Sequence, residues 1–269
     1  MNGNDITWLG LGFGILSLLL PIAILIKYKT NLAKPTIIAF SRMLVQLAFL
    51  GLYLKYIFEL DSIYLNILWI IIMMIAAGFS VTNRSELPLR SFLLPVTGAV
   101  LTNVLINATF FAILILGPEK TSSARYLIPI MGMVIGNTLT SSIVGIRSYI
   151  NVVTKNEDEY KFNLMSGADF KEAQQDFIAF ALRDALNPGI ASTAVIGLIW
   201  LPGMMTGQIL GGSDPLTAIK YQIVIITTIF VGSVITLLVA IHLIKRMTFD
   251  DYGNLNRNLI NSGKNGSDR

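Results

Sequence analysis

The chain has 269 residues, of which 54% are hydrophobic and only 13% are charged, with a formal net charge of +4. Soluble globular domains carry about 25% charged residues, so this composition indicates a membrane protein. The chain contains no cysteine, which excludes disulfides, thiolate metal sites and thiol nucleophiles. Its basic residues flank apolar segments rather than forming one patch, which predicts membrane topology and no nucleic-acid partner.

Seven apolar segments are long enough to cross the lipid bilayer as helices. A helix of about 20 apolar residues spans a hydrocarbon core of about 30 Å. In chain order, the predicted spans cover residues 6–26, 36–58, 62–81, 91–116, 126–147, 188–210 and 217–244. We therefore expect an all-α, polytopic membrane protein with about seven transmembrane helices. Residues 1–247 make up this domain, and the polar tail 248–269 is expected to be disordered.

The distribution of Lys and Arg predicts the orientation of these spans. If the loops after the second, fourth and sixth spans face outside, they hold only two clear loop cations, Lys120 and Arg125. The opposite side then holds fifteen. Because cytoplasmic loops are enriched in Lys and Arg, the N-terminus is expected outside and the C-terminus in the cytoplasm. We expect the protein in the cell inner (plasma) membrane.

Polar residues within the predicted spans are candidates for a substrate path, because unpaired polar groups are costly in a membrane. Arg42 and Gln46 lie one turn apart in the second span, and Asn103 and Asn107 lie one turn apart in the fourth. Asn137 lies in the fifth span. Two other roles fit the same pattern. Arg42 is close enough to the membrane surface to reach headgroup phosphates, and the asparagines can form hydrogen bonds between helices.

The longest charged stretch of the chain, residues 150–187, follows the fifth span on the predicted cytoplasmic side. Apolar residues recur at helical spacing at Phe170, Ala173 and Phe177, with charges and amides between them. Asp169 and Glu172 have the spacing of a capping box, which predicts that a helix begins there. The apolar face of this helix can bind a protein partner, or it can anchor the loop at the lipid headgroups.

The sixth span is interrupted by "LPGMMTGQ". Pro202 and Gly203 favour a break in the helix and therefore a hinge. Met204 and Met205 follow directly, and two thioethers are candidate ligands for a soft metal ion, although methionine is also common at flexible packing contacts.

The predicted spans contain no acidic residue well inside the membrane, and the only histidine, His242, lies near a span end. Carriers coupled to protons or sodium ions usually place a carboxylate at the membrane midplane, so this class is disfavoured. A preformed Fe(II) site is disfavoured for the same reason. An enzyme is not expected either, because no Ser–His pair, carboxylate pair or metal set is present.

Four strings carry a resemblance to a known family: "LMSGADFKEA" (164–173), "SRMLVQLAFLGLYLKYIF" (41–58), "LIPIMGMVIGNTLTSS" (127–142) and "IWLPGMMTGQILGGSDPLTAIKYQI" (199–223). They resemble the FetB-type iron-export permeases of ABC transporters, a family related to plant aluminium-tolerance permeases. The resemblance implies a permease that exports iron or another metal species, driven by a separate ATPase subunit that binds ATP and Mg²⁺. Gly167, Phe170 and Phe177 would then contact the ATPase.

The residues agree with this division of labour. The chain has no G-x-x-x-x-G-K-[ST] loop, so ATP binding is expected on a partner. A pair of ATPase subunits needs two coupling surfaces and this chain offers one, which predicts a homodimer of permeases. Two alternatives remain open: an ABC permease for a non-metal small solute, and a membrane scaffold that transports nothing.

Overall fold

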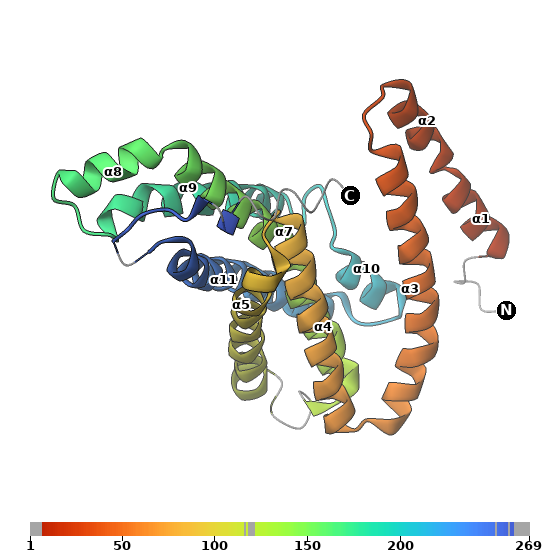
Figure 1. The fold of residues 1–269 in the computed structure, drawn as a ribbon. Coiled ribbons are helices and arrows are strands. Elements are labelled where there is room, and N and C mark those ends of the chain that lie inside the picture. The colour runs from red at the N-terminus through yellow and green to blue at the C-terminus, as the bar shows by residue number, and fades with distance from the viewer. Residues whose placement is uncertain (1–6, 116, 118–121, 251, 258, 261–269) are drawn as a thin grey trace. The chain divides into compact units, whose positions relative to one another are not determined.

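The computed structural model describes residues 7–115, 117, 122–250, 252–257 and 259–260, and every long element in these ranges is a helix (Figure 1). The all-α prediction is therefore confirmed. The chain divides after Leu60 into two compact units, which we describe separately.

The first unit contains α1 (Trp8–Leu16), α2 (Leu19–Lys27) and α3 (Ala33–Leu60). The hydroxyl of Thr7 caps α1 by accepting a hydrogen bond from the backbone N–H of Gly10 at 3.2 Å. Most of the large apolar side chains on these helices are exposed, including Trp8 and Phe49. Exposed apolar side chains all round a helix are typical of a helix that faces lipid.

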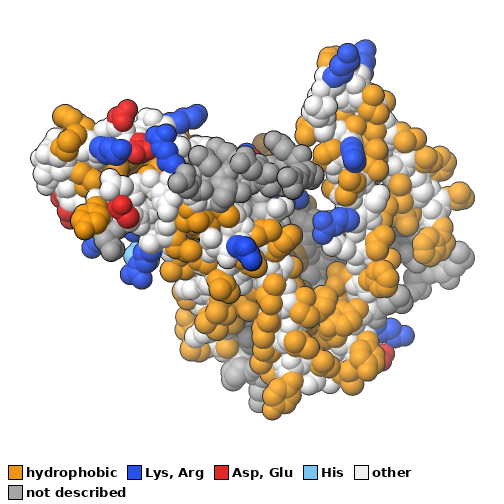
Figure 2. All heavy atoms as spheres, in the orientation of Figure 1, with side chains coloured by type: hydrophobic (Ala, Val, Ile, Leu, Met, Phe, Trp, Pro, Cys, Tyr) orange, Lys and Arg blue, Asp and Glu red, His pale blue; other side chains and the backbone are white. Residues whose placement is uncertain are grey.

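The second unit holds the remaining helices. They are α4 (Ile63–Arg84), α5 (Leu89–Phe110) with a π-helical extension η1 (Phe111–Ile115), α7 (Ala124–Lys155), α8 (Glu157–Met165), α9 (Glu172–Ala194), α10 (Gly203–Leu210) and α11 (Pro215–Thr248). Helix α7 is central, because it packs against α4, α9 and α11, and α5 packs against both α4 and α11. In Figure 2, charged side chains gather at the α8–α9 end of this unit.

Six helical segments of the described chain are long and apolar enough to span a membrane, rather than seven. They are Trp8–Lys27, Ala33–Leu60, Ile63–Arg84, Leu89–Ile115, Ala124–Lys155 and Pro215–Thr248. The predicted sixth span, 188–210, is not a single helix. Helix α9 ends at Ala194 and the chain is irregular until α10 begins at Gly203, so the range 188–210 contains only the last turns of α9 and the 8 residues of α10, each too short to span the membrane.

The first part of the polar tail is folded, which differs from the predicted disorder. Phe249 and Ile260 are buried, and the hydroxyl of Tyr160 donates a hydrogen bond to the carbonyl of Gly253 at 2.9 Å. The guanidinium of Arg257 lies 2.6 Å from the carboxylate of Glu157. A few apolar residues in a polar sequence therefore hold this segment against α8, while residues 261–269 lie outside the described part of the chain.

Candidate functional site

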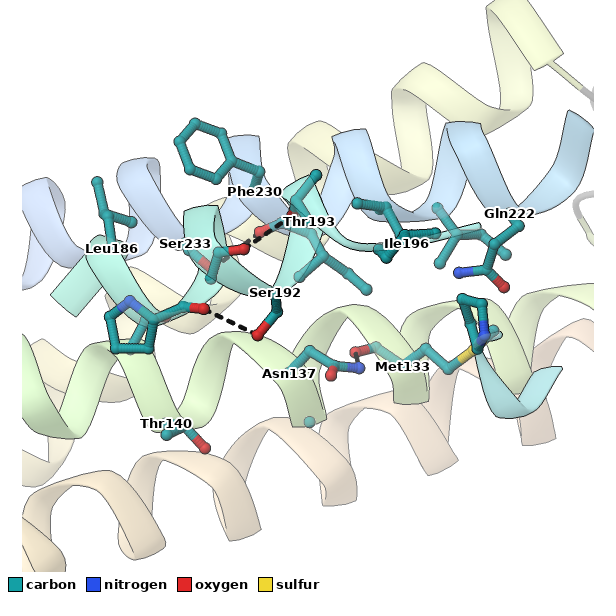
Figure 3. Close-up of a pocket in the computed structure, with 18 of the residues that line it drawn as sticks. Met133, Asn137, Thr140, Leu186, Ser192, Thr193, Ile196, Gln222, Phe230 and Ser233 are labelled. Carbon is teal, nitrogen blue, oxygen red and sulfur yellow. Dashed lines mark hydrogen bonds between the residues drawn. The ribbon is translucent and has the colours of Figure 1, made fainter. Parts of the chain in front are cut away.

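A pocket of about 580 Å³, which we call the cavity, lies among α7, α9, α10 and α11 of the second unit and is open on one side, where residues such as Asn137 and Ser192 are exposed (Figure 3). Its size is within the range of about 300–1,000 Å³ that is common for small-molecule sites. Helix α9 supplies the wall from Ala185 to Thr193, and the irregular segment after it supplies Ile196 and Trp200. The interruption of the predicted sixth span therefore helps to form the cavity.

All side chains that line the cavity are uncharged. Seven of them are polar: Asn137, Thr140, Ser141, Ser192, Thr193, Gln222 and Ser233. Two thioethers, those of Met133 and Met204, complete the set of possible ligands. The described residues contain no cluster of three or more His, Cys, Asp or Glu side chains that could hold a metal ion.

Most of the polar side chains in the cavity use their hydrogen-bond donors within their own helices. The hydroxyls of Ser192, Thr193 and Ser233 each donate to the carbonyl four residues earlier, at 2.8, 2.8 and 2.9 Å. The side-chain amide of Asn137 donates in the same way at 2.8 Å. Since the hydroxyl protons are occupied, these hydroxyls have their oxygen lone pairs left for a ligand, whereas Asn137 keeps both its amide oxygen and a second N–H.

Gln222 is the most unusual of these residues. Its side chain is 8% exposed and points into the cavity in Figure 3. Its Oε1 is buried and has no hydrogen-bond partner. A buried amide oxygen without a partner is costly, so a rotation of the amide that lets a ligand or water donate to this oxygen would be stabilising.

The predicted site residues of the interrupted span are partly brought together here. Pro202, Gly203 and Met204 line the cavity together with Asn137, whereas Met205 does not. Neighbouring side chains on a helix diverge by about 100°, so the predicted thioether pair is split. Met204 instead shares the cavity with Met133 of α7.

The predicted hinge has a different geometry from the one expected. Pro202 does not interrupt a helix but directly precedes the first residue of α10. The break begins earlier, after Ala194, and the chain turns at Gly197, whose φ is +84°. This backbone conformation favours glycine, so the sequence feature that the prediction missed is Gly197.

The other predicted path residues lie elsewhere. Asn103 and Asn107 are buried on α5 outside the cavity, and the amide of Asn103 donates to the hydroxyl of Thr138 on α7 at 3.4 Å. Asn103 therefore connects α5 to α7, as the alternative interpretation stated, whereas the amide of Asn107 donates only to Asn103 on its own helix. Arg42 and Gln46 are exposed on α3, in the first unit.

Sequence reasoning missed most of the cavity wall. Ser192, Thr193 and Ser233 are common helix residues, and no pattern separates them from hydroxyls that face lipid or pack between helices. Gln222 was a further available signal, because it is an amide that follows Lys220 and Tyr221 and directly precedes the apolar residues 223–226 of α11.

The charged stretch forms a hairpin of α8 and α9, in which Gly167 makes the turn with a φ of +97°. The capping box closes in both directions. The backbone N–H of Asp169 donates to Glu172 Oε2 at 2.9 Å, and the N–H of Glu172 donates to Asp169 Oδ1 at 2.7 Å. The backbone N–H groups of Glu172 and Lys171 both donate to Asp169 Oδ1, and they hold the pKa of Asp169 below its usual value.

The two phenylalanines predicted to contact an ATPase are covered by the protein itself. Phe177 is 4% exposed and belongs to the core between α7, α9 and α11. The ring of Phe170 packs edge-on against Tyr160 and Phe249, with centroids 6.4 and 5.4 Å away. Phe177 cannot enter the groove of a partner without leaving its own core, whereas Phe170 is only partly buried, so contact of these residues with an ATPase stays a prediction that the burial of Phe177 disfavours.

Other apolar residues of the hairpin are free. Phe162 and Met165 on α8 are 64% and 80% exposed. Glu157, at the start of α8, binds Lys161 at 2.7 Å and Arg257 at 2.6 Å. These two cations, Lys161 more than Arg257, hold the pKa of the Glu157 carboxyl below its usual value and outweigh the effect of burial.

Comparison with known proteins places this arrangement in a family. The model of the family described as "Uncharacterised protein family (UPF0014)" matches residues 8–249. The "Probable iron export permease protein FetB" of Escherichia coli is 30% identical over 93% of this chain and 95% of its own length. "UPF0014 membrane protein YjkA" of Bacillus subtilis is 29% identical over 85% of this chain and 90% of its own.

A plant protein is also similar. "Protein ALUMINUM SENSITIVE 3" of Arabidopsis thaliana is 30% identical over 76% of this chain and 74% of its own length. No solved structure matches the chain. The family match covers almost all of the described helices, from the start of α1 to the end of α11. The chain therefore belongs to the UPF0014 family of membrane proteins.

Proposed function

We propose that the chain is the permease subunit of an ABC transporter that exports a metal species and is driven by a separate ATPase subunit, which binds ATP and Mg²⁺. Two copies of the permease bind two ATPase subunits in the plasma membrane. The α8–α9 hairpin and the C-terminus face the cytoplasm, and the N-terminus faces outside. The name of the E. coli relative supports the metal and the direction of transport.

The observation that carries this proposal is the course of α9. The helix begins in the charged hairpin and runs without interruption from Glu172 to Ala194, so that its last turns form a wall of the cavity. Its 23 residues span about 34 Å at 1.5 Å per residue. A movement of the hairpin would therefore be transmitted along one continuous helix to the cavity.

The hairpin is also held firmly enough to transmit force. The hydroxyl of Tyr149 on α7 donates to Gln174 Oε1 at 2.9 Å, and that of Ser148 donates to Asp184 Oδ2 at 2.6 Å. Phe177 and Ala181 bury the same face of α9. Because the buried face is already used, the exposed residues Phe162 and Met165 replace Phe170 and Phe177 as the proposed ATPase contacts.

The experiment is to co-express the chain with ABC ATPase subunits of the same genome and to purify the complex through the permease. Mass photometry should show two permeases with two ATPases, and ATP hydrolysis should exceed that of the ATPase alone. Met165→Asp should abolish the stimulation, because it places a charge on an apolar contact. Its matched control, Met165→Leu, should keep the stimulation because it preserves the volume and the apolar surface.

Membrane insertion and unfolding temperature should be the same for both variants, because the side chain is exposed. A Met165→Asp complex that assembles and hydrolyses ATP like the unchanged protein would remove the hairpin tip from the coupling surface. Failure of every ATPase to co-purify would favour the scaffold interpretation.

A further inference from the structure

We infer that the cavity binds its solute by accepting hydrogen bonds from N–H or O–H groups on the outer shell of the solute, with Gln222 Oε1 as the central acceptor once the side-chain amide of Gln222 turns toward the cavity. The inference rests on the proposed function, because it names the class of solute that the permease carries. A metal ion would then cross with its own ligand shell intact, and it would not be coordinated directly by the protein.

The polar side chains that line the cavity have more hydrogen-bond acceptors than free donors. Ser192, Thr193, Ser233 and Asn137 each commit a donor to the carbonyl four residues earlier, so their oxygens remain as acceptors. Gln222 adds a buried oxygen without a partner. N–H donors also remain on Asn137 and Gln222, but the lone pairs of the seven polar side chains outnumber them, which suits a solute with outward-facing N–H or O–H groups.

The described residues that line the cavity carry no charged side chain. Removing the water from a metal cation is very costly unless anionic or several strong ligands replace it. The cavity has no carboxylate, imidazole or thiolate, and its two sulfurs come from Met133 and Met204. A bare divalent cation would therefore lose more solvation than these side chains return. A cation that keeps its shell avoids that cost.

The cavity has enough volume for an ion together with its shell of ligands. Water occupies roughly 30 Å³ per molecule in the liquid, so a shell of about six waters needs roughly 180 Å³. The cavity of about 580 Å³ holds such a shell with room to spare. A site that coordinates a bare ion would instead bring its ligands to within direct bonding distance of one point.

The same acceptors fit two sources of donors, namely a hydrated or ammine-covered cation and an uncharged solute rich in hydroxyl groups. Binding should therefore be measured on the full chain in lipid nanodiscs, without an ATPase, using two probes. Hexaamminecobalt(III) presents N–H groups on a shell that does not exchange, so a thioether cannot coordinate its metal. Mannitol presents hydroxyl groups without charge.

We expect at least one probe to bind with one site per chain. Gln222→Leu should weaken that binding by about tenfold or more, the factor expected when a hydrogen-bond acceptor is lost. Gln208→Leu is the matched control. Gln208 on α10 also has a buried Oε1 without a partner, but it does not line the cavity. Met133→Leu with Met204→Leu should leave the affinity within about twofold, since the change conserves volume.

The binding results distinguish the two kinds of solute that could supply the donors. Binding of hexaamminecobalt(III) alone would identify a cation with an intact shell, and binding of mannitol alone would identify an uncharged, hydroxyl-rich solute. Binding of neither probe, equal losses in Gln222→Leu and Gln208→Leu, or loss in the methionine variant would overturn the inference. Because no ATPase is present, this result is independent of the ATP hydrolysis experiment. A failure of coupling with intact binding would count only against the proposed function.

Discussion

Two groups of polar side chains in the second unit differ in their surroundings although their residue types are the same. Asn103 and Asn107 are almost fully buried, and their amides bind Thr138 and the Asn103 carbonyl. Asn137 is exposed to the cavity and binds only its own helix. The contrast is sharpest on α7, where the neighbours Asn137 and Thr138 point to different partners. An amide in a span therefore packs between helices or lines the cavity according to the helix face that carries it.

The largest expected effect on stability comes from adding a methyl group beside the buried side chain of Asn103. A Cβ at position 232 would overlap the side chain of Asn103, so Gly232→Ala should force the amide out of its place. We expect a loss of about 1–3 kcal/mol of stability, as for other overpacked cores. Thermal unfolding in detergent measures it.

Asn103→Ala provides the second half of that test. The double variant Asn103→Ala with Gly232→Ala should be less destabilised than the sum of the single variants, because the overlap is gone. Additive losses would show that the two residues are not in contact, and the buried group would lose its structural interpretation.

Gly197→Ala should have the next largest effect, on the side of the cavity. The φ of +84° at Gly197 is unfavourable for alanine, by roughly 1–2 kcal/mol. Since the neighbouring Ile196 and Trp200 line the cavity, probe binding should weaken together with stability. Pro202→Ala with Gly203→Ala should leave the break in place, because it begins eight residues before Gly203, after Ala194. A continuous helix in the Ala pair would restore the original hinge interpretation.

The sequence predicted most of the fold, because apolar length determines a membrane helix locally. It did not predict that residues 188–210 fail to form one span, because hydropathy carries no information about the left-handed backbone conformation at Gly197. The capping box at Asp169 was predicted because both of its partners lie within one turn. The burial of Phe177 was not predicted. An apolar helix face has the same sequence pattern whether α7 or another protein covers it.

The candidate site was less predictable for a related reason. Asn137 and Met204 were identified as single polar or sulfur-containing residues, but the cavity forms only where α7 packs beside the consecutive helices α9, α10 and α11. Gln222 shows what was missing. Its residue type can be read from the sequence. That its Oε1 has no hydrogen-bond donor nearby can be known only from the packing of the helices around it.

Asn137→Ala tests the comparison directly, with a smaller effect on stability. Its side chain binds only the carbonyl of Met133 on its own helix, so the unfolding free energy should change by less than about 0.5 kcal/mol. Probe binding should weaken because one acceptor is lost from the cavity. A stability loss as large as that of Asn103→Ala would mean that the two asparagines have the same role.

The smallest expected effect is that of pH on the cavity. No titratable side chain lines it, so probe affinity should stay constant between about pH 5 and pH 8. The hairpin should titrate only in acid. Lys161 and Arg257 hold the folded-state pKa of Glu157 below its unfolded value, so their stabilisation is fully present above the unfolded pKa. It is lost as the pH falls through the folded pKa, below about pH 4.

Arg257→Ala should raise the folded-state pKa of Glu157 toward the usual value and start this loss at a higher pH. Thermal unfolding measured from about pH 3 to pH 7 would show the shift, and probe binding at each pH would serve as the internal control. The two regions are expected to respond separately, because the ion pairs of Glu157 lie at the start of α8 and the cavity wall begins at Ala185 on α9. If probe affinity between about pH 5 and pH 8 followed a titration curve, a charged group would have to reach the cavity, and recognition there could not rest on uncharged acceptors alone.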